Sequence, residues 1–114
     1  MGVISWSPLA GGWLSGAFGA GKQNTSRRSA RLPARYDLSL PGNQKKLEVV
    51  GELETVAHDA GLTLIELALA FVLEHPAISA AIIGPRTMEH LESQLGAADI
   101  VLDEAVLELS LIHI

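Results

Sequence analysis

The feature that most constrains this chain is an alternation of short apolar strand-like segments with helical segments. Residues 2–6 and 80–83 have the length and apolar composition of buried strands; two helical stretches lie between them and a third helix follows. Parallel strands joined by helical crossovers give this alternation. Because two strands can neither form a doubly covered sheet nor close a barrel, we predict a portion of a larger α/β domain.

The helices between the two strands have clear predicted ends. Asn43 is expected to cap the first helix, whose apolar positions recur every three or four residues until Gly61 supplies a C-terminal glycine. Thr63 and Glu66 form a T-x-x-E capping box for the second helix, which Pro76 stops. This second helix is apolar on nearly all sides, so it should be buried against neighbours on more than one face.

Residues 10–42 have the composition of a long loop, with several glycines, two prolines and a cluster of arginines. Arg27, Arg28, Arg31 and Arg35 make up this cluster, which lacks helical periodicity, so a solvated loop is expected. With a net charge of −5 and no other basic concentration, the chain is not expected to bind nucleic acid.

The composition also bears on the cellular compartment. The chain has no cysteine, which excludes disulfides and thiolate zinc sites and is compatible with a reducing cytoplasm. Its N-terminus lacks the basic region of a secretory signal, and no apolar run approaches the roughly 18 residues of a membrane span. We therefore expect a cytoplasmic protein without a membrane partner.

Two places put glycine and a polar group directly after a strand. The first is the Ser-Pro-Leu-Ala-Gly-Gly stretch of residues 7–12, and the second comprises Gly84, Pro85, Arg86 and Thr87. Thr87 is a natural N-cap for the third helix, whose apolar face is expected to include Leu91, Leu95 and Ala98. A guanidinium beside a helix N-terminus suits a phosphate, although a plain turn with Arg86 in solvent explains the same residues.

Two longer stretches resemble the aldo/keto reductase family. GVISWSPLAGGWLSG is similar to the family's seventh strand and its Ser-Pro-Leu-x-x-Gly loop, and LALAFVLEHPAISAAIIGPRTMEHLESQLGAAD to its last helix, eighth strand and cofactor-binding helix. Both match in order and spacing. The resemblance implies the C-terminal portion of a (β/α)₈ TIM barrel, namely its last two β/α units. Residues 1–108 would be a partial reductase domain, and residues 109–114, which resemble a translated sequencing adapter, a non-native tail.

The same resemblance assigns cofactor roles residue by residue, and the family's cofactor is NADP(H). Trp6 would stack on the nicotinamide, and Ser7, Leu9 and Gly11 would contact the pyrophosphate. Gly84 and Arg86 would hold the adenosine 2′-phosphate, His90 would contact the same phosphate, and Gln94 would contact the adenine. Ser93 departs from the family's usual glutamate. From the residues alone, a tryptophan that ends a strand, such as Trp6, is often a core residue, and His90 is equally well explained as a solvated helix histidine.

The family reduces a small-molecule carbonyl substrate, an aldehyde or ketone, with a tyrosine acid assisted by lysine, aspartate and histidine on earlier strands. No residue of this chain is assigned a catalytic role: Tyr36 lies within the long loop, and the histidines lack metal-ligand spacing. The implied function is therefore a reductase portion that contributes phosphate-binding loops. The alternative is a non-catalytic polypeptide with weak NADP binding or a structural role.

A rival from another enzyme class is a P-loop nucleotide hydrolase. Residues 16–22 fit G-x-x-x-x-G-K, but Gln23 stands where a serine or threonine must ligate magnesium, and no apolar helix follows. The pattern is therefore disfavoured as a nucleotide site.

Overall fold

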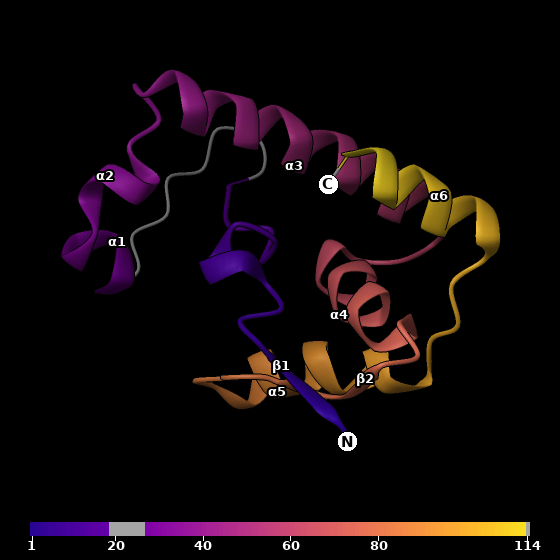
Figure 1. Cartoon of the computed structure of the whole chain (residues 1–114). Coiled ribbons are helices and arrows are strands. Elements are labelled where there is room, and N and C mark those ends of the chain that lie inside the picture. Colours follow the sequence, from indigo (N-terminus) through magenta and orange to yellow (C-terminus); the bar gives the residue numbers. More distant parts are fainter. Residues whose placement is uncertain (19–26, 114) are drawn as a thin grey trace.

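The computed structural model describes residues 1–18 and 27–113 of the chain (Figure 1). The residues 19–22 that complete the P-loop pattern lie outside this description. The described elements, in chain order, are β1 (Val3–Trp6), the 3₁₀ turn η1 (Ala10–Gly12), α1 (Arg27–Arg31), α2 (Pro33–Tyr36), α3 (Pro41–Asp59), α4 (Leu64–Glu74), β2 (Ile78–Ile82), α5 (Met88–Leu95), the 3₁₀ turn η3 (Gly96–Asp99) and α6 (Glu104–His113).

The two strands pair in parallel, as the alternation of strands and helices predicted. Ile4 lies opposite Ala80 and Trp6 opposite Ile82, with an irregularity between Val3 and Ile4. The expectation that residues 2–6 form a buried strand is wrong, because the Ile4 side chain is 64% exposed and Trp6 77%. Among the described residues β1 pairs only with β2, so its apolar side chains lack the second neighbour that would cover them.

The α4 helix forms as predicted. Thr63 Oγ1 accepts a hydrogen bond from the Glu66 amide at 3.2 Å, and Glu66 Oε2 accepts one from the Thr63 amide at 2.8 Å, which completes the capping box. The helix packs against α3, β2, α5 and η3. Burial on several faces confirms the inference drawn from its apolar composition. Leu64, Leu67, Ala68, Leu69 and Ala70 are its buried residues.

The α3 helix begins earlier than predicted and ends where predicted. Pro41 occupies its first turn, where the missing N–H costs no helical bond. Asn43 is not the N-cap: it is buried inside the helix and donates from Nδ2 to Ala34 O and Asp37 O. At the other end Gly61 has φ +73°, and the Leu62 amide donates to Ala57 O at 2.8 Å, which together form a Schellman motif.

The expectation of a continuous loop over residues 10–42 is wrong for its described parts. The η1 turn, α1 and α2 all lie in that stretch, and Pro33 opens α2 at its first turn. Arg31 and Arg35 therefore lie on short helices. One-turn helices are too short to produce an apolar period, so the pattern of residues could not reveal them.

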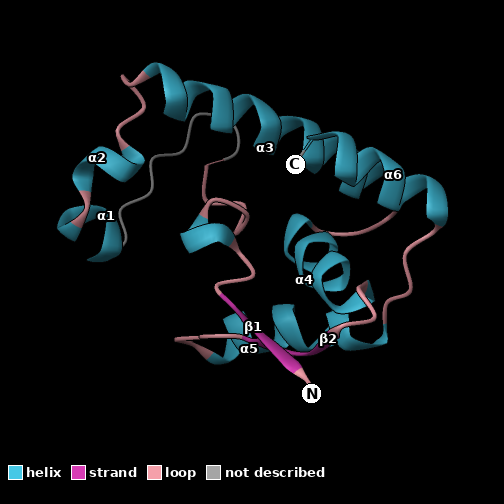
Figure 2. Cartoon of the chain, in the orientation of Figure 1, coloured by secondary structure: helices cyan, strands magenta, loops and turns pink. Residues whose placement is uncertain are grey.

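Helices α3 and α6 lie on the side of the molecule away from the strands, and α4 packs against both α3 and β2 (Figures 1 and 2). Two hydrophobic clusters lie among these helices. The first joins η1 and α2 to α3, and the second joins α3, α4 and α6. The first contains Trp13, Phe18, Tyr36, Val50, Leu53 and Leu64. The second contains Ala57, Leu67, Ala70 and Leu102.

The α6 helix begins next to Asp103 and lies alongside α3 (Figure 1). It continues through residue 109 without a break. Ser110 is only 1% exposed, and its hydroxyl donates to Val106 O at 2.8 Å. That residues 109–114 are a non-native tail stays a prediction.

Among the described residues, no single helix is both long and apolar enough to cross a membrane, and α3 with α4 would reach that length only as a pair bent by 88°.

Candidate functional site

The two polar loops singled out in the sequence leave the sheet at the same edge. Trp6 and Ile82 are paired partners at the carboxyl ends of parallel strands, so Ser7 and the residues that follow Ile82 begin side by side. Paired strands lie about 4.8 Å apart, which is less than the span of a pyrophosphate group and its ribose. Ligands of open α/β sheets bind at this kind of edge.

The first loop is tightly folded by its own hydrogen bonds. Ser7 and Ala10 have φ values of +57° and +52°, in the left-handed region that non-glycine residues seldom adopt, and Gly11 follows at +72°. The Gly11 amide donates to Ser7 Oγ at 3.2 Å, and the Gly12 amide to Leu9 O at 2.9 Å. Since Ser7 Oγ accepts one bond, its O–H hydrogen can still be donated to an anion.

Tyr36 anchors this loop from a distance in the sequence. Its hydroxyl donates to Gly11 O at 2.7 Å, and its ring lies in a stack with Trp13 and Phe18. A Cβ added to Gly11 would lie 2.9 Å from an Arg35 guanidinium nitrogen and 3.3 Å from the Tyr36 hydroxyl. Glycine is therefore required here by both its backbone conformation and the closeness of its neighbours.

The second loop is open. Gly84 and Arg86 are exposed, and no atom lies within 4 Å of a Cβ placed on Gly84. Thr87 caps α5 as predicted, its Oγ1 accepting from the His90 amide at 3.1 Å. The amides of the two residues before His90 therefore remain at the helix end, beside Arg86, although Glu89 adds an acidic group to the same turn.

The remaining candidate residues differ in accessibility. Trp6 is exposed, so its alternative role as a core residue does not hold in this structure, and Leu9 is half-buried. His90 is exposed on α5, and the Ser93 hydroxyl donates to the His90 carbonyl oxygen at 2.9 Å. Trp6 and His90 are thus both accessible to a ligand.

Gln94 faces the protein rather than solvent. It is 9% exposed, and its Oε1 atom is buried without a hydrogen-bond partner among the described residues. The prediction that Leu95 belongs to a buried apolar face of α5 is wrong, because Leu95 is 55% exposed; the neighbouring Ala97 is buried instead. The adenine contact assigned to Gln94 stays a prediction, and it would require this side chain to turn outward.

Asp37, which follows Tyr36, accepts two hydrogen bonds from Ser39. The Ser39 hydroxyl donates to Asp37 Oδ1 at 2.6 Å, and the Ser39 amide donates to the same oxygen at 2.9 Å. These two bonds lower the pKa of the Asp37 carboxyl below its usual value of 3.8. The carboxylate is exposed and closes the turn between α2 and α3.

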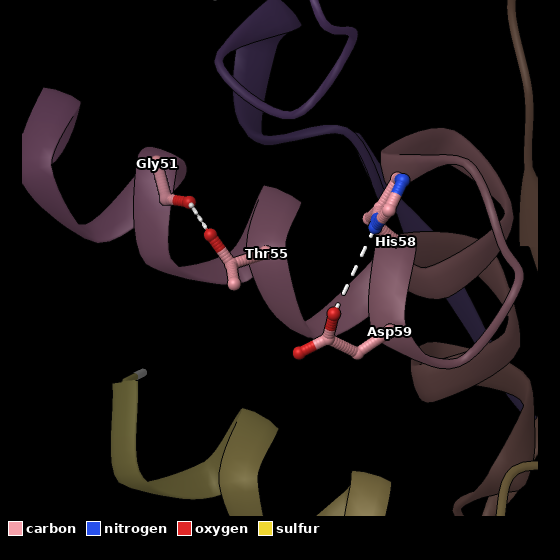
Figure 3. Close-up of polar contacts among 4 residues, drawn as sticks. All are labelled: Gly51, Thr55, His58 and Asp59. Atoms are coloured by element: carbon pink, nitrogen blue, oxygen red, sulfur yellow. Dashed lines mark hydrogen bonds and ion pairs between the residues drawn. The ribbon is translucent and has the colours of Figure 1, made fainter.

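That no residue of this chain has a catalytic role stays a prediction. His58 Nδ1 lies 3.7 Å from Asp59 Oδ1 at the end of α3, and both side chains are exposed (Figure 3). The Tyr36 hydroxyl is already donated to Gly11 O. Among the described residues, no cluster of histidine and acidic side chains could hold a metal ion.

Sequence reasoning missed the role of Tyr36 as the anchor of the first loop. The hydroxyl and Gly11 lie 25 residues apart, and the composition of the intervening stretch indicated only a loop. The one available signal was a tyrosine between two charged residues, Arg35 and Asp37. Had its burial been expected, its hydroxyl would have required a hydrogen-bond partner.

Comparisons with known proteins identify the family of this chain. The family model described as "Aldo/keto reductase family" matches residues 1–110. "Uncharacterized oxidoreductase YrpG" of Bacillus subtilis is 39% identical over 109 residues, which cover 96% of this chain and 31% of that protein. "Putative voltage-gated potassium channel subunit beta" of Schizosaccharomyces pombe is 30% identical over 101 residues, which cover 88% of this chain and 29% of that protein.

The chain thus spans about a third of the length of these relatives. Its α/β architecture, with two parallel strands and helical crossovers, is compatible with a portion of the barrel that the family forms. With nearly all of its residues matched by the family model, the chain belongs to the aldo/keto reductase family.

Proposed function

We propose that this chain supplies the NADP(H) phosphate-binding loops of a reductase that converts aldehydes or ketones to alcohols. The observation that carries the proposal is the common origin of the two loops at one sheet edge, set by the pairing of Trp6 with Ile82. Residues 1–108 would be the last two β/α units of a (β/α)₈ barrel, with β1 and β2 as neighbouring barrel strands.

The groups of the first loop fit the pyrophosphate. The Gly12 amide is used inside the loop, which leaves the Ser7 hydroxyl as the donor that we assign to a phosphate oxygen. Leu9 and Gly11 would shape the surface against which the pyrophosphate lies. Exposed Trp6, at the end of β1, would stack on the nicotinamide, the group that carries the hydride when the cofactor is bound.

The groups of the second loop fit the adenosine 2′-phosphate. Arg86 offers a fork of N–H donors and a full positive charge, and the N-terminus of α5 adds its partial positive charge at the same place. Gly84 lets the phosphate approach the backbone, and exposed His90 lies within the first turn of the helix. Arg86 therefore favours NADP over NAD, which lacks this phosphate.

The catalytic groups are proposed to lie outside this chain. The carbonyl substrate would be bound and protonated by other parts of the protein, and the chain alone would not turn it over. A non-catalytic polypeptide with weak NADP binding or a structural role is the alternative. A cytoplasmic location and the absence of nucleic-acid and membrane partners remain predictions from the sequence.

The proposal is tested by calorimetric titration of the chain with NADP⁺ and NAD⁺. We expect NADP⁺ to bind at least tenfold more tightly, since a charge-assisted bond to phosphate is worth roughly 1.5–3 kcal/mol. The Arg86→Ala variant should bind NADP⁺ as weakly as NAD⁺. Arg31→Ala, which removes an exposed arginine from α1, is the matched control and should leave both affinities unchanged.

Equal affinity for the two cofactors, or unchanged NADP⁺ affinity in Arg86→Ala, would contradict the role given to Arg86. NADPH oxidation with a generic aldehyde separates the two functions. We expect none from the chain alone and turnover from a longer protein that contains it. Turnover by the chain alone would refute the assignment of catalysis to other segments.

A further inference from the structure

A pocket with a volume of about 480 Å³ lies between the η1 turn and the first half of α3. None of the residues that line it is among the eight candidate cofactor residues. Its walls come from residues 10–14, from the end of α2 and from α3. The pocket is therefore a second candidate site for a small molecule.

The lining combines an apolar floor with a basic rim. Buried Trp13, Val50 and Leu53 belong to the first hydrophobic cluster and present the floor. Arg35 and Lys45 lie on the rim with exposed charged groups, and Lys46 joins them. Among the described residues that line the pocket none is acidic, so the charged side chains nearest to a bound molecule are positive.

The walls of this pocket are held in place by interactions already described. Tyr36 joins α2 to the Gly11 backbone, and the buried Asn43 amide joins α2 to α3. The Lys46 ammonium lies 5.6 Å from the centre of the Trp13 ring and donates to Asn43 Oδ1 at 3.4 Å. A ligand would thus meet a shaped site and order few side chains on binding.

We propose that this pocket binds a small monoanionic acid with an aromatic or aliphatic body. The body would pack on Trp13 and Leu53, where it removes apolar surface from water. The carboxylate or sulfonate would be held at the rim by the Arg35 guanidinium and the Lys45 ammonium, which have no acidic side chain beside them in the lining. Both requirements must be met, so neither a neutral apolar molecule nor a simple inorganic anion satisfies the site.

The experiment uses the whole chain and two probes that share an aromatic body. Anilinonaphthalene sulfonate carries the acid, and N-phenylnaphthylamine lacks it; both fluoresce more strongly in apolar surroundings. We expect the sulfonate to bind about tenfold more tightly than the neutral probe, the gain typical of a charge-assisted contact. In Trp6→Phe, where Trp13 is the remaining tryptophan, its fluorescence should be quenched by the bound sulfonate.

Charge-removing variants locate the binding. Arg35→Gln and Lys45→Gln should each weaken the sulfonate severalfold and leave the neutral probe unaffected, since these side chains are exposed and their loss does not disturb the core. Arg31→Gln, which removes the same charge outside the pocket, is the control. Equal binding of both probes, or equal losses in Arg31→Gln and Arg35→Gln, would overturn the proposal.

Competition with NADP⁺ distinguishes this site from the one proposed for the cofactor. We expect saturating NADP⁺ to leave the sulfonate bound. Displacement that disappears in Arg86→Ala would mean that the pocket is part of the cofactor site, which would also overturn the inference. Failure of NADP⁺ to bind at all would refute the proposed function and leave the results for the two probes as they stand.

Discussion

The two loops at the sheet edge are built in opposite ways. The loop after β1 carries four positive φ values, at Ser7, Ala10, Gly11 and Gly12, bonds between its own backbone groups and an anchor from Tyr36. The loop after β2 is open, with Gly84 and Arg86 exposed, and its described support is the Thr87 cap of α5. The first loop therefore has its shape before any ligand arrives, whereas the second offers charge and helix amides to whatever binds there.

This difference separates stability from ligand recognition. Substitutions in the first loop should lower the free energy of unfolding, because its residues contact the hydrophobic cluster of Trp13, Phe18 and Tyr36. Substitutions of the second loop's exposed side chains should change the affinity for a ligand and leave the free energy of unfolding unchanged. Thr87 lies between these cases, since it supports a helix end.

The largest expected effect is that of Gly11→Ala. The added methyl group meets an unfavourable φ of +72°, which costs roughly 1–2 kcal/mol, and it displaces Arg35 and weakens the Tyr36 hydrogen bond, which is worth about 1 kcal/mol. Urea unfolding followed by circular dichroism measures the change in free energy.

Gly61→Ala is the matched control for Gly11→Ala. Gly61 has φ +73°, but no atom lies within 4 Å of its Cβ position, so only the backbone strain of roughly 1 kcal/mol is expected. If the two variants lost equal stability, the anchoring of the first loop by Tyr36 would contribute nothing to the free energy of unfolding.

A smaller effect is expected for Thr87→Ala. Loss of the cap leaves the His90 amide without its partner and should destabilise the protein by about 1 kcal/mol. Thr55→Ala is the control, because the Thr55 hydroxyl bonds back to Gly51 O at 3.1 Å within α3 and caps nothing (Figure 3). Thermal melts of both variants give the comparison, and equal melting temperatures would show that the cap is dispensable.

The smallest effect concerns pH and Asp37. Because the pKa of its carboxyl is lowered in the folded protein, its stabilising contribution is fully present above the unfolded value of 3.8 and is lost as the pH falls through the folded value. Ser39→Ala removes the hydroxyl that contributes most to this shift. Urea unfolding of both proteins at neutral pH and below pH 3.8 should give a slightly steeper acid loss in the parent, and parallel curves would contradict the assignment.

Local sequence patterns predicted the helix ends at Gly61 and Thr63, whereas the position of Asn43 depends on tertiary contacts. Gly61 and the Thr63–Glu66 pair act within one turn of chain, so their patterns were sufficient. Asn43 has the chemistry of an N-cap, but Pro41 begins the helix and two carbonyls of the preceding turn bind its amide. Such a choice depends on neighbours that the local pattern does not contain.

The candidate site followed the same division. The Ser7 and Arg86 loops could be predicted from the glycine and polar residues that follow the strands, together with the family resemblance. The rim of the pocket could not be predicted from the sequence, because Arg35 and Lys45 come close to Trp13 only after α2 and α3 have packed. The burial of Gln94 was equally hidden, since Leu91, Leu95 and Ala98 were expected to form the buried face of this helix.

The stack of Trp13, Phe18 and Tyr36 also determines what optical measurements can see. Trp13 and Phe18 lie 4.2 Å apart between ring centres, and the only other aromatic residues are Trp6, which is exposed, and Phe71. Buried-tryptophan fluorescence therefore follows the first cluster, while helical circular dichroism follows both clusters. If the second cluster opened separately, the two signals would change at different denaturant concentrations.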